Sequence, residues 1–180
     1  WVKGEPLKIV THHWSSNRMK GFDVYEKLDK LILSEEWKGK IEFTYIGNIP
    51  KGFNFKNTKV IKPISGKNLA RELSRHHVYI TGSINEPAGM HHIEAVLSGL
   101  PVIYKNSGAL PEYCKNFGVS FDYLEFIPAL DKMTKNYYVY KENLKNYSNT
   151  ATKMSEEYLN LFKKLIQKKE EIVFKRRIFR

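Results

Sequence analysis

Short apolar runs alternate with helical stretches along the first two thirds of the chain, and this alternation constrains the fold more than any other feature. The runs typical of β-strands cover residues 7–13, 41–46, 59–62, 78–81, 101–104 and 119–121. The stretches typical of helices cover residues 22–33, 68–74, 90–97 and 110–115. Strands that alternate with helices form parallel β-α-β units, and right-handed crossovers place helices on both faces of the sheet. We therefore predict a three-layer α/β domain with a mainly parallel sheet of about six strands.

The last third of the chain has a helical pattern without strands. Residues 123–135 and 141–169 are predicted to form helices. Apolar residues recur on one face of the second helix: Met154, Tyr158, Leu161, Phe162 and Leu165. Such a stripe usually faces a hydrophobic core, so we expect it to pack on the α/β domain, although a helix of this length could also reach toward a second domain. The chain is thus predicted to form one domain, residues 1–180, with a core of residues 1–122 and a helical C-terminal extension of residues 123–180.

The length and composition of the chain favour a globular domain without a membrane-spanning segment or an internal disulfide. The 180 residues are enough for one domain with a real core. No apolar run approaches the roughly 20 residues that span a bilayer, and residues 1–8 are mixed and charged, unlike a signal peptide. Cys114 is the single cysteine and cannot form an internal disulfide. We therefore expect a cytoplasmic, reducing environment.

The chain is strongly basic, with a net charge of +11 and a pI near 9.6. Much of the excess lies in residues 163–180. A basic face suits nucleic acid, an anionic membrane or a phosphorylated ligand. It is equally well explained as a solvated helix face. Charge alone therefore leaves a basic module that binds RNA or a membrane as an alternative function.

The loops that follow the strands are the expected place for a ligand. In parallel sheets, ligands bind beyond the carboxyl ends of the strands. Three of these loops are rich in small and polar residues, at 14–21, 82–89 and 105–108. The chemistry of the protein should therefore be sought in these three loops.

Two glutamates in the second loop and the helix after it suggest a nucleotide site. Glu94 lies eight residues after Glu86, about one turn into the predicted helix. The free N–H groups of Gly89, Met90 and His91 at the helix start would suit a diphosphate. The carboxylate of Glu94 could accept both hydroxyls of a ribose, and that of Glu86 could accept hydroxyls of a sugar.

The first loop adds a cation. Lys20 stands at the start of the first helix, where an ammonium can reach phosphate oxygens. Two loops from neighbouring strands could then grip one diphosphate. Three pairs of adjacent histidines also occur, but neighbouring side chains diverge, and no cysteine or carboxylate spacing completes a metal site. No metal is expected.

Four motifs, in this order, resemble those of the retaining family 4 glycosyltransferases. Residues 20–23 (KGFD) resemble the K-G-[FVW]-[DE] turn of that family, and Glu86 and Glu94 match its E-x7-E motif. Residues 95–103 (AVLSGLPVI) look like the E-A-x-x-x-G-x-P-V-[IV] continuation, and residues 107–112 (SGALPE) resemble the G-G-x-P-E loop. The similarity covers residues 8–121, and in this order the motifs are specific.

The resemblance implies the C-terminal, donor-binding, Rossmann-like domain of a GT-B enzyme. Such an enzyme transfers a sugar from a UDP-, GDP- or ADP-sugar to a glycan or lipid-linked acceptor, retains the anomeric configuration and needs no metal. Glu86 would be catalytic, and the base would lie near residues 63–69. The residues implied to bind the nucleotide-sugar are Ser15, Arg18, Lys20, Gly66, Gly89, Met90, His91 and Glu94. The N-terminal acceptor domain is missing from this chain, so we expect it to bind donor but to transfer poorly.

The sequence also departs from the family pattern. Ser15 occupies the position of an arginine that usually stands five residues before the lysine, and Arg18 is the nearest replacement. One fewer positive charge beside a departing diphosphate could cost a few kcal/mol of transition-state stabilisation. A nucleotide-sugar epimerase or a phosphorylase of the same fold remains an alternative, because fold alone does not define function. The basic tail could also assist peripheral membrane contact.

Overall fold

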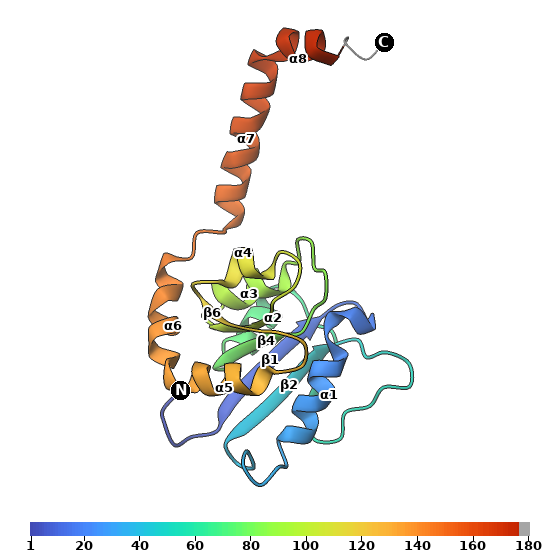
Figure 1. The fold of residues 1–180 in the computed structure, drawn as a ribbon, viewed down its shortest axis with the longest axis vertical. Helices are drawn as coiled ribbons and strands as arrows, with labels where there is room; N and C mark the ends of the chain where they lie inside the picture. Colours follow the sequence, from blue (N-terminus) through green and yellow to red (C-terminus); the bar gives the residue numbers. More distant parts are fainter. Residues whose placement is uncertain (177–180) are drawn as a thin grey trace. The chain divides into compact units, whose positions relative to one another are not determined.

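The computed structural model describes residues 1–176, and its centre is a sheet of six parallel strands (Figure 1). The strands are β1 (Leu7–His13), β2 (Ile41–Gly47), β3 (Lys59–Ile61), β4 (Val78–Thr81), β5 (Val102–Lys105) and β6 (Gly118–Phe121). Their order across the sheet is β3-β2-β1-β4-β5-β6. The pairing of β1 with β2 is the longest and runs from Leu7↔Ile41 to His13↔Gly47.

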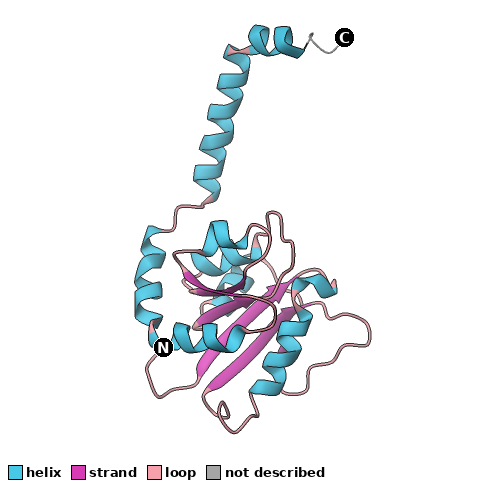
Figure 2. Cartoon of the chain, in the orientation of Figure 1, coloured by secondary structure: helices cyan, strands magenta, loops and turns pink. Residues whose placement is uncertain are grey.

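Helices cover both faces of this sheet, as Figure 2 shows. One face is covered by α1 (Phe22–Leu31) and α5 (Phe126–Lys135), and the other by α2 (Gly66–Leu73), α3 (His91–Leu97) and α4 (Leu110–Cys114). Successive strand residues point to opposite faces, so Ile9 belongs to the first core and Val10 to the second. The predicted three-layer α/β fold is confirmed, and every strand is parallel.

The C-terminal helices differ from the prediction. Residues 141–169 do not form one helix. They are divided among α6 (Tyr137–Asn143), the 3-10 turn η2 (Leu144–Asn146), α7 (Ala151–Gln167) and the start of α8 (Lys169–Arg176). The break coincides with a run of Asn, Ser and Thr residues, whose side chains compete with helical hydrogen bonding. Thr150 begins α7 by accepting a hydrogen bond from the N–H of Lys153.

The helix predicted from residue 123 begins at Phe126 instead. Tyr123 has a φ of 48°, a left-handed conformation that an α-helix excludes. The hydrophobic side of α5, formed by Phe126, Ala129, Leu130 and Met133, is buried as the apolar pattern requires.

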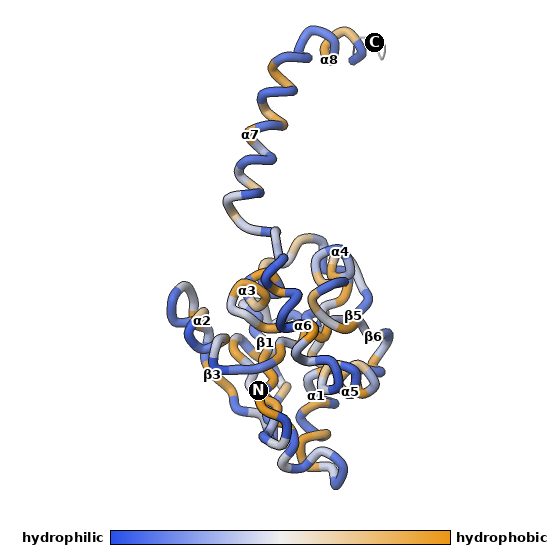
Figure 3. Tube along the Cα trace, turned by 90° about the vertical axis from the view of Figure 1, so that its left-hand side faces the viewer, coloured by the Kyte–Doolittle hydropathy of each residue, from blue (hydrophilic) through white to orange (hydrophobic). Residues whose placement is uncertain are grey.

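The chain divides into two compact units, residues 1–147 and 148–180. Within the second unit no side chain of α7 or α8 is buried, and apolar and polar residues alternate along α7 (Figure 3). The packing of its apolar stripe on the domain stays a prediction. Two arginines of the predicted basic tail, Arg177 and Arg180, lie outside the described residues. No helix in residues 1–176 is long and apolar enough to cross a membrane.

Candidate functional site

A cavity of about 330 Å³ opens where the strand order of the sheet reverses. The chain runs from β1 through β2 to β3 on one side, and β4 pairs with β1 on the other. The loops after these strands therefore diverge and leave a crevice, which is where doubly wound sheets bind ligands. The cavity is lined by His12, His13, Trp14, Ser15, Lys20, Ile46, Gly47, Pro63, Ile64, Ser65, Leu69, Gly89, Met90, His91 and Glu94.

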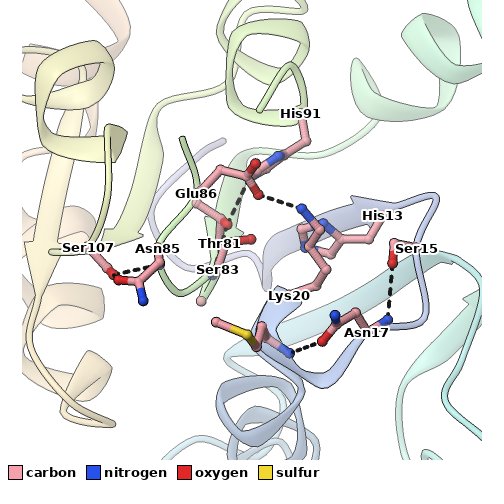
Figure 4. Close-up of polar contacts among 12 residues, drawn as sticks. His13, Ser15, Asn17, Lys20, Thr81, Ser83, Asn85, Glu86, His91 and Ser107 are labelled. Atoms are coloured by element: carbon pink, nitrogen blue, oxygen red, sulfur yellow. Dashed lines mark hydrogen bonds and ion pairs between the residues drawn. The ribbon is translucent and has the colours of Figure 1, made fainter. Parts of the chain in front are cut away.

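The loops after β1 and β4 are joined by an ion pair between Lys20 and Glu86. Lys20 Nζ lies 2.6 Å from Glu86 Oε2, and the two side chains point toward each other in Figure 4. The Glu86 side chain is only 9% exposed, so its charge is largely shielded from water. A buried carboxylate needs such a partner, because an unpaired charge in a low dielectric is strongly unfavourable.

Local backbone structure brings Lys20 to this position. The Asn17 side chain accepts a hydrogen bond from the N–H of Met19 and begins the 3-10 turn η1 (Arg18–Lys20). Gly21 follows with a φ of 98°, and a Cβ there would lie 2.5 Å from Gly82 Cα. Glycine at this position thus allows the left-handed turn into α1 and the close approach of the loop after β4.

The loop after β5 supports Glu86 from the other side. The N–H of Asn85 donates to Ser107 Oγ at 2.9 Å, and the N–H of Ala109 donates to the Glu86 carbonyl at 2.9 Å. Gly89 completes this arrangement, because a Cβ there would lie 2.7 Å from Glu86 Cδ and 2.7 Å from His91 Nδ1. Gly89 was expected as a free N–H donor at the helix start, and in the structure its lack of a side chain also gives room to Glu86 and His91.

The second carboxylate of the pair is held by a histidine. His12 Nε2 lies 2.9 Å from Glu94 Oε2, and this hydrogen bond lowers the pKa of Glu94. Glu94 therefore stays ionised at neutral pH. Its side chain is 47% exposed and lines the cavity, so the carboxylate is available to a ligand.

Buried aromatic and imidazole rings form the floor of the site. His13 Nε2 accepts a hydrogen bond from the Tyr25 hydroxyl at 2.6 Å, and His91 Nε2 lies 3.0 Å from Thr81 Oγ1. The Tyr25 hydroxyl accepts hydrogen bonds from the Gly82 N–H and from Thr11 Oγ1, which leaves its own proton for His13. Burial raises the pKa of Tyr25 to about 12. Burial also lowers the pKa of His13 and of His91 well below 6.5. Both imidazoles are consequently neutral polar groups at neutral pH.

The structure brings most of the predicted site residues together. Six of them line the cavity: Ser15, Lys20, Gly89, Met90, His91 and Glu94. Glu86 reaches the same place through its ion pair with Lys20. The backbone N–H groups of Gly89, Met90 and His91 donate no hydrogen bond within residues 1–176, which agrees with free donors at the start of α3.

Two predicted residues lie apart from the cavity wall. The Arg18 side chain is 61% exposed and its Nη1 lies 3.9 Å from Asp23 Oδ1, so in this structure it does not replace the arginine absent at Ser15. Gly66 begins α2 with a φ of 56°, directly after Ser65, which does line the cavity. Ser65 and its neighbours therefore form the wall near the predicted base site.

Three further residues that line the cavity were not predicted from the sequence: His12, His13 and Trp14. The three pairs of adjacent histidines were weighed as metal ligands, and among them only His91 was also expected to bind the nucleotide-sugar. The position of His12, His13 and Trp14 at the carboxyl end of the first strand could have indicated a place in the site, because residues there border the crevice. In residues 1–176 no group of three or more His, Cys, Asp or Glu side chains is arranged to hold a metal ion. Cys114 is buried, and burial raises its thiol pKa to about 12, so it is not a reactive thiol.

The fold and the site define a doubly wound α/β domain with a cavity at its switch point that is lined by apolar and polar side chains. Residues 49–154 match the family model described as "Glycosyl transferases group 1". This match covers more than half of the chain, which therefore belongs to the group 1 glycosyltransferase family. No curated protein matches the chain in sequence.

Several solved structures share this fold. The pneumococcal O-GlcNAc transferase GtfA, in complex with UDP and GlcNAc, is 15% identical with a TM-score of 0.64, and the match covers 91% of this chain and 36% of that one. WaaG, a glycosyltransferase involved in lipopolysaccharide biosynthesis, is 17% identical with a TM-score of 0.66, covering 82% and 44%.

The fold of this chain corresponds to only part of the longer structures that it matches. The C-terminal domain of LpcC, a glycosyl transferase group 1 family protein from Francisella tularensis, is 17% identical with a TM-score of 0.59, covering 80% of this chain and 84% of that one. The chain thus spans less than half the length of GtfA and WaaG but most of this isolated domain. Its fold is that of the C-terminal domain of a GT-B glycosyltransferase.

Proposed function

We propose that this chain binds a nucleoside diphosphate sugar in the cavity and supports metal-independent, configuration-retaining transfer of the sugar to a glycan or lipid-linked acceptor. The observation that carries the proposal is the convergence of two carboxylates on one cavity. Glu86 and Glu94 are each held there by a basic side chain from β1 or the loop after it. The membership of the chain in the group 1 family supports the same conclusion.

The nucleoside would bind between the loop after β3 and α3. Pro63, Ile64 and Ser65 form a mostly apolar wall suited to a flat base. Glu94, ionised and half exposed, would accept hydrogen bonds from the ribose hydroxyls. The base itself is left open by these contacts, so UDP-, GDP- and ADP-sugars are all candidates.

The diphosphate would bind to Lys20 and to the free N–H groups at the start of α3. Lys20 already has an anionic partner, so donor binding exchanges Glu86 for phosphate oxygens. Glu86 then faces the sugar, whose hydroxyls can donate hydrogen bonds to its carboxylate in place of Lys20, and it would act there as the catalytic group. Ser15 supplies no charge, so the leaving diphosphate depends on Lys20 and on groups from the N-terminal domain of a complete GT-B enzyme.

Calorimetric titration with UDP, GDP and ADP, without added metal, tests the proposal. We expect the chain to bind one of these nucleotides at micromolar to millimolar concentration, and Glu94→Ala to abolish that binding. Glu36→Ala is a matched control, because Glu36 is an exposed glutamate in the turn region after α1. Failure of the wild-type chain to bind any of the three nucleotides would contradict the proposal for this chain.

A further inference from the structure

His12 lies near the end of β1, where its backbone and its ring are fixed by contacts with Tyr79. The residue is 8% exposed. Its N–H donates to the Tyr79 hydroxyl at 3.2 Å, and its carbonyl lies 3.2 Å from the same hydroxyl. The two rings meet edge to face, with centroids 5.5 Å apart. The imidazole therefore has little freedom to turn.

The surroundings of the two ring nitrogens define the role of the imidazole. Nδ1 is buried and has no hydrogen-bond partner in residues 1–176, whereas Nε2 lies 2.9 Å from Glu94 Oε2. A buried N–H without an acceptor is unfavourable, so the proton of the neutral ring belongs on Nε2. His12 thus donates a hydrogen bond to the carboxylate through Nε2–H.

Glu94 has little else to fix its side chain. It projects from α3 with its side chain 47% exposed. Its other oxygen, Oε1, has no hydrogen-bond partner among the described residues. A half-exposed glutamate samples several rotamers, and ordering it on ligand binding would reduce affinity. The hydrogen bond from His12 fixes the Glu94 carboxylate before the ligand binds.

We infer that His12 is a positioning residue that sets the Glu94 carboxylate to recognise ribose. His12 occupies Oε2 and leaves Oε1 to the ligand, so the pair selects a ribonucleotide over a nucleotide without ribose hydroxyls. His12 does not itself contact the reacting atoms. This inference rests on the proposed function, because it assigns a ligand group to the same cavity.

The test compares two ligands on three proteins. The ligands are the nucleoside diphosphate that the chain binds, chosen from UDP, GDP and ADP, and its 2′,3′-dideoxy analogue. The proteins are the wild-type chain, His12→Phe and His12→Gln. Phenylalanine keeps an aromatic ring against Tyr79 but has no donor, whereas glutamine restores an N–H at a similar reach. Circular dichroism and thermal unfolding of each variant report whether it folds.

We expect the loss of the imidazole donor to weaken binding of the ribonucleotide but not of its dideoxy analogue. His12→Phe should weaken binding of the ribonucleotide about 10-fold, which is typical of a hydrogen bond to a charged group, and leave the dideoxy analogue within about twofold. His12→Gln should recover most of the ribonucleotide affinity. If His12→Phe does not fold, His12→Leu takes its place as the variant without a donor: a selective loss of ribonucleotide affinity supports the inference, and an unchanged ratio of affinities overturns it.

Two other outcomes separate this inference from the proposed function. Equal weakening of both ligands by His12→Phe, or no weakening of either, would overturn the role of His12 while nucleotide binding itself stands. Absence of nucleotide binding by the wild-type chain would contradict the proposed function, and this inference with it.

Discussion

At the scale of residues, the candidate site has no surplus of positive charge although the chain carries a net charge of +11. Lys20 and Glu94 are the charged residues that line the cavity, and Lys20 is already paired with Glu86. His13 and His91 add no charge at neutral pH, because burial lowers the pKa of each. Binding of a diphosphate must therefore depend on the exchange of partners at Lys20 rather than on a surplus of positive charge.

Substitutions of the two partners should have opposite effects on nucleotide affinity. Lys20→Met removes the cation and should weaken binding of the nucleoside diphosphate at least about 10-fold. Glu86→Gln removes the competing carboxylate and should strengthen binding by about two- to fivefold, since Lys20 is then free for phosphate. Both effects are measured by calorimetry.

A lysine outside the site provides the control for this pair of variants. Lys30 forms an ion pair with Glu26 on α1 and is 72% exposed, so Lys30→Met should leave nucleotide affinity unchanged. Weaker binding by Glu86→Gln would show that the carboxylate supports the nucleotide directly and that the exchange does not occur.

At the scale of elements, the site depends on three loops that hold one another. The N–H of Ile84, after β4, donates to the Met19 carbonyl in η1, and Asn85 donates to Ser107 after β5. Ser107 occupies the first glycine position of the motif that the family usually carries. Its hydroxyl explains this departure, because it accepts the N–H of Asn85, a residue with a φ of 52°.

Removal of this hydroxyl should loosen the loop that carries Glu86. We expect Ser107→Ala to lower the free energy of unfolding by about 0.5–1 kcal/mol, the net contribution of an ordinary hydrogen bond accessible to water. Chemical denaturation measures the change. Ser74→Ala is the control for loss of a hydroxyl, because Ser74 caps the end of α2 away from the loop after β4. An unchanged nucleotide affinity together with unchanged stability would contradict a supporting role for Ser107.

At the scale of the whole molecule, buried histidines should make stability depend on pH. His13, His91 and His92 all have lowered pKa values through burial, that of His92 to about 4. Below pH 6.5 the unfolded chain binds protons on these rings while the folded chain does not. Stability is therefore complete above pH 6.5 and falls with decreasing pH, by about 1.4 kcal/mol per pH unit for each ring that stays neutral.

His92 offers the sharpest test of this dependence. Neither of its ring nitrogens has a hydrogen-bond partner within residues 1–176, and its ring centroid lies 5.1 Å from that of Tyr113. His92→Phe should therefore fold and reduce the slope of unfolding free energy against pH between 6.5 and 5. Denaturant titrations at several pH values measure the slope. The same slope in the variant and the wild type would rule out a contribution from His92.

The basic tail can be separated from the site by truncation. All residues that line the cavity lie between positions 12 and 94, within the unit of residues 1–147. Deletion of residues 163–180 should leave nucleotide affinity within about twofold, because every residue that lines the cavity is retained. Binding to RNA or to vesicles of anionic phosphatidylglycerol, if the wild-type chain has it, should be lost. Nucleotide binding that disappears while circular dichroism shows a folded domain would contradict this separation.

Much of the α/β core was predictable because its signals are local. The apolar run at β1 and the run at β4 were predicted with the same bounds that the structure has, since buried parallel strands read as continuous apolar segments. The C-terminal helices were less predictable. Apolar residues recur at helical spacing on both sides of Thr150, so the periodicity predicted one continuous helix. The structure instead begins a new helix after Thr150, which caps it.

The sequence by itself determined the class of fold, the order of the strands along the chain and the two glutamates at their fixed spacing, because these depend on residue type and on short intervals. Only the tertiary structure decided which side chains become partners. The pairs Lys20–Glu86 and His12–Glu94 join residues 66 and 82 positions apart, and they meet because β1 and β4 are neighbours in the sheet. The crossover connection places β4 beside β1, and a local sequence pattern does not predict which strands become neighbours.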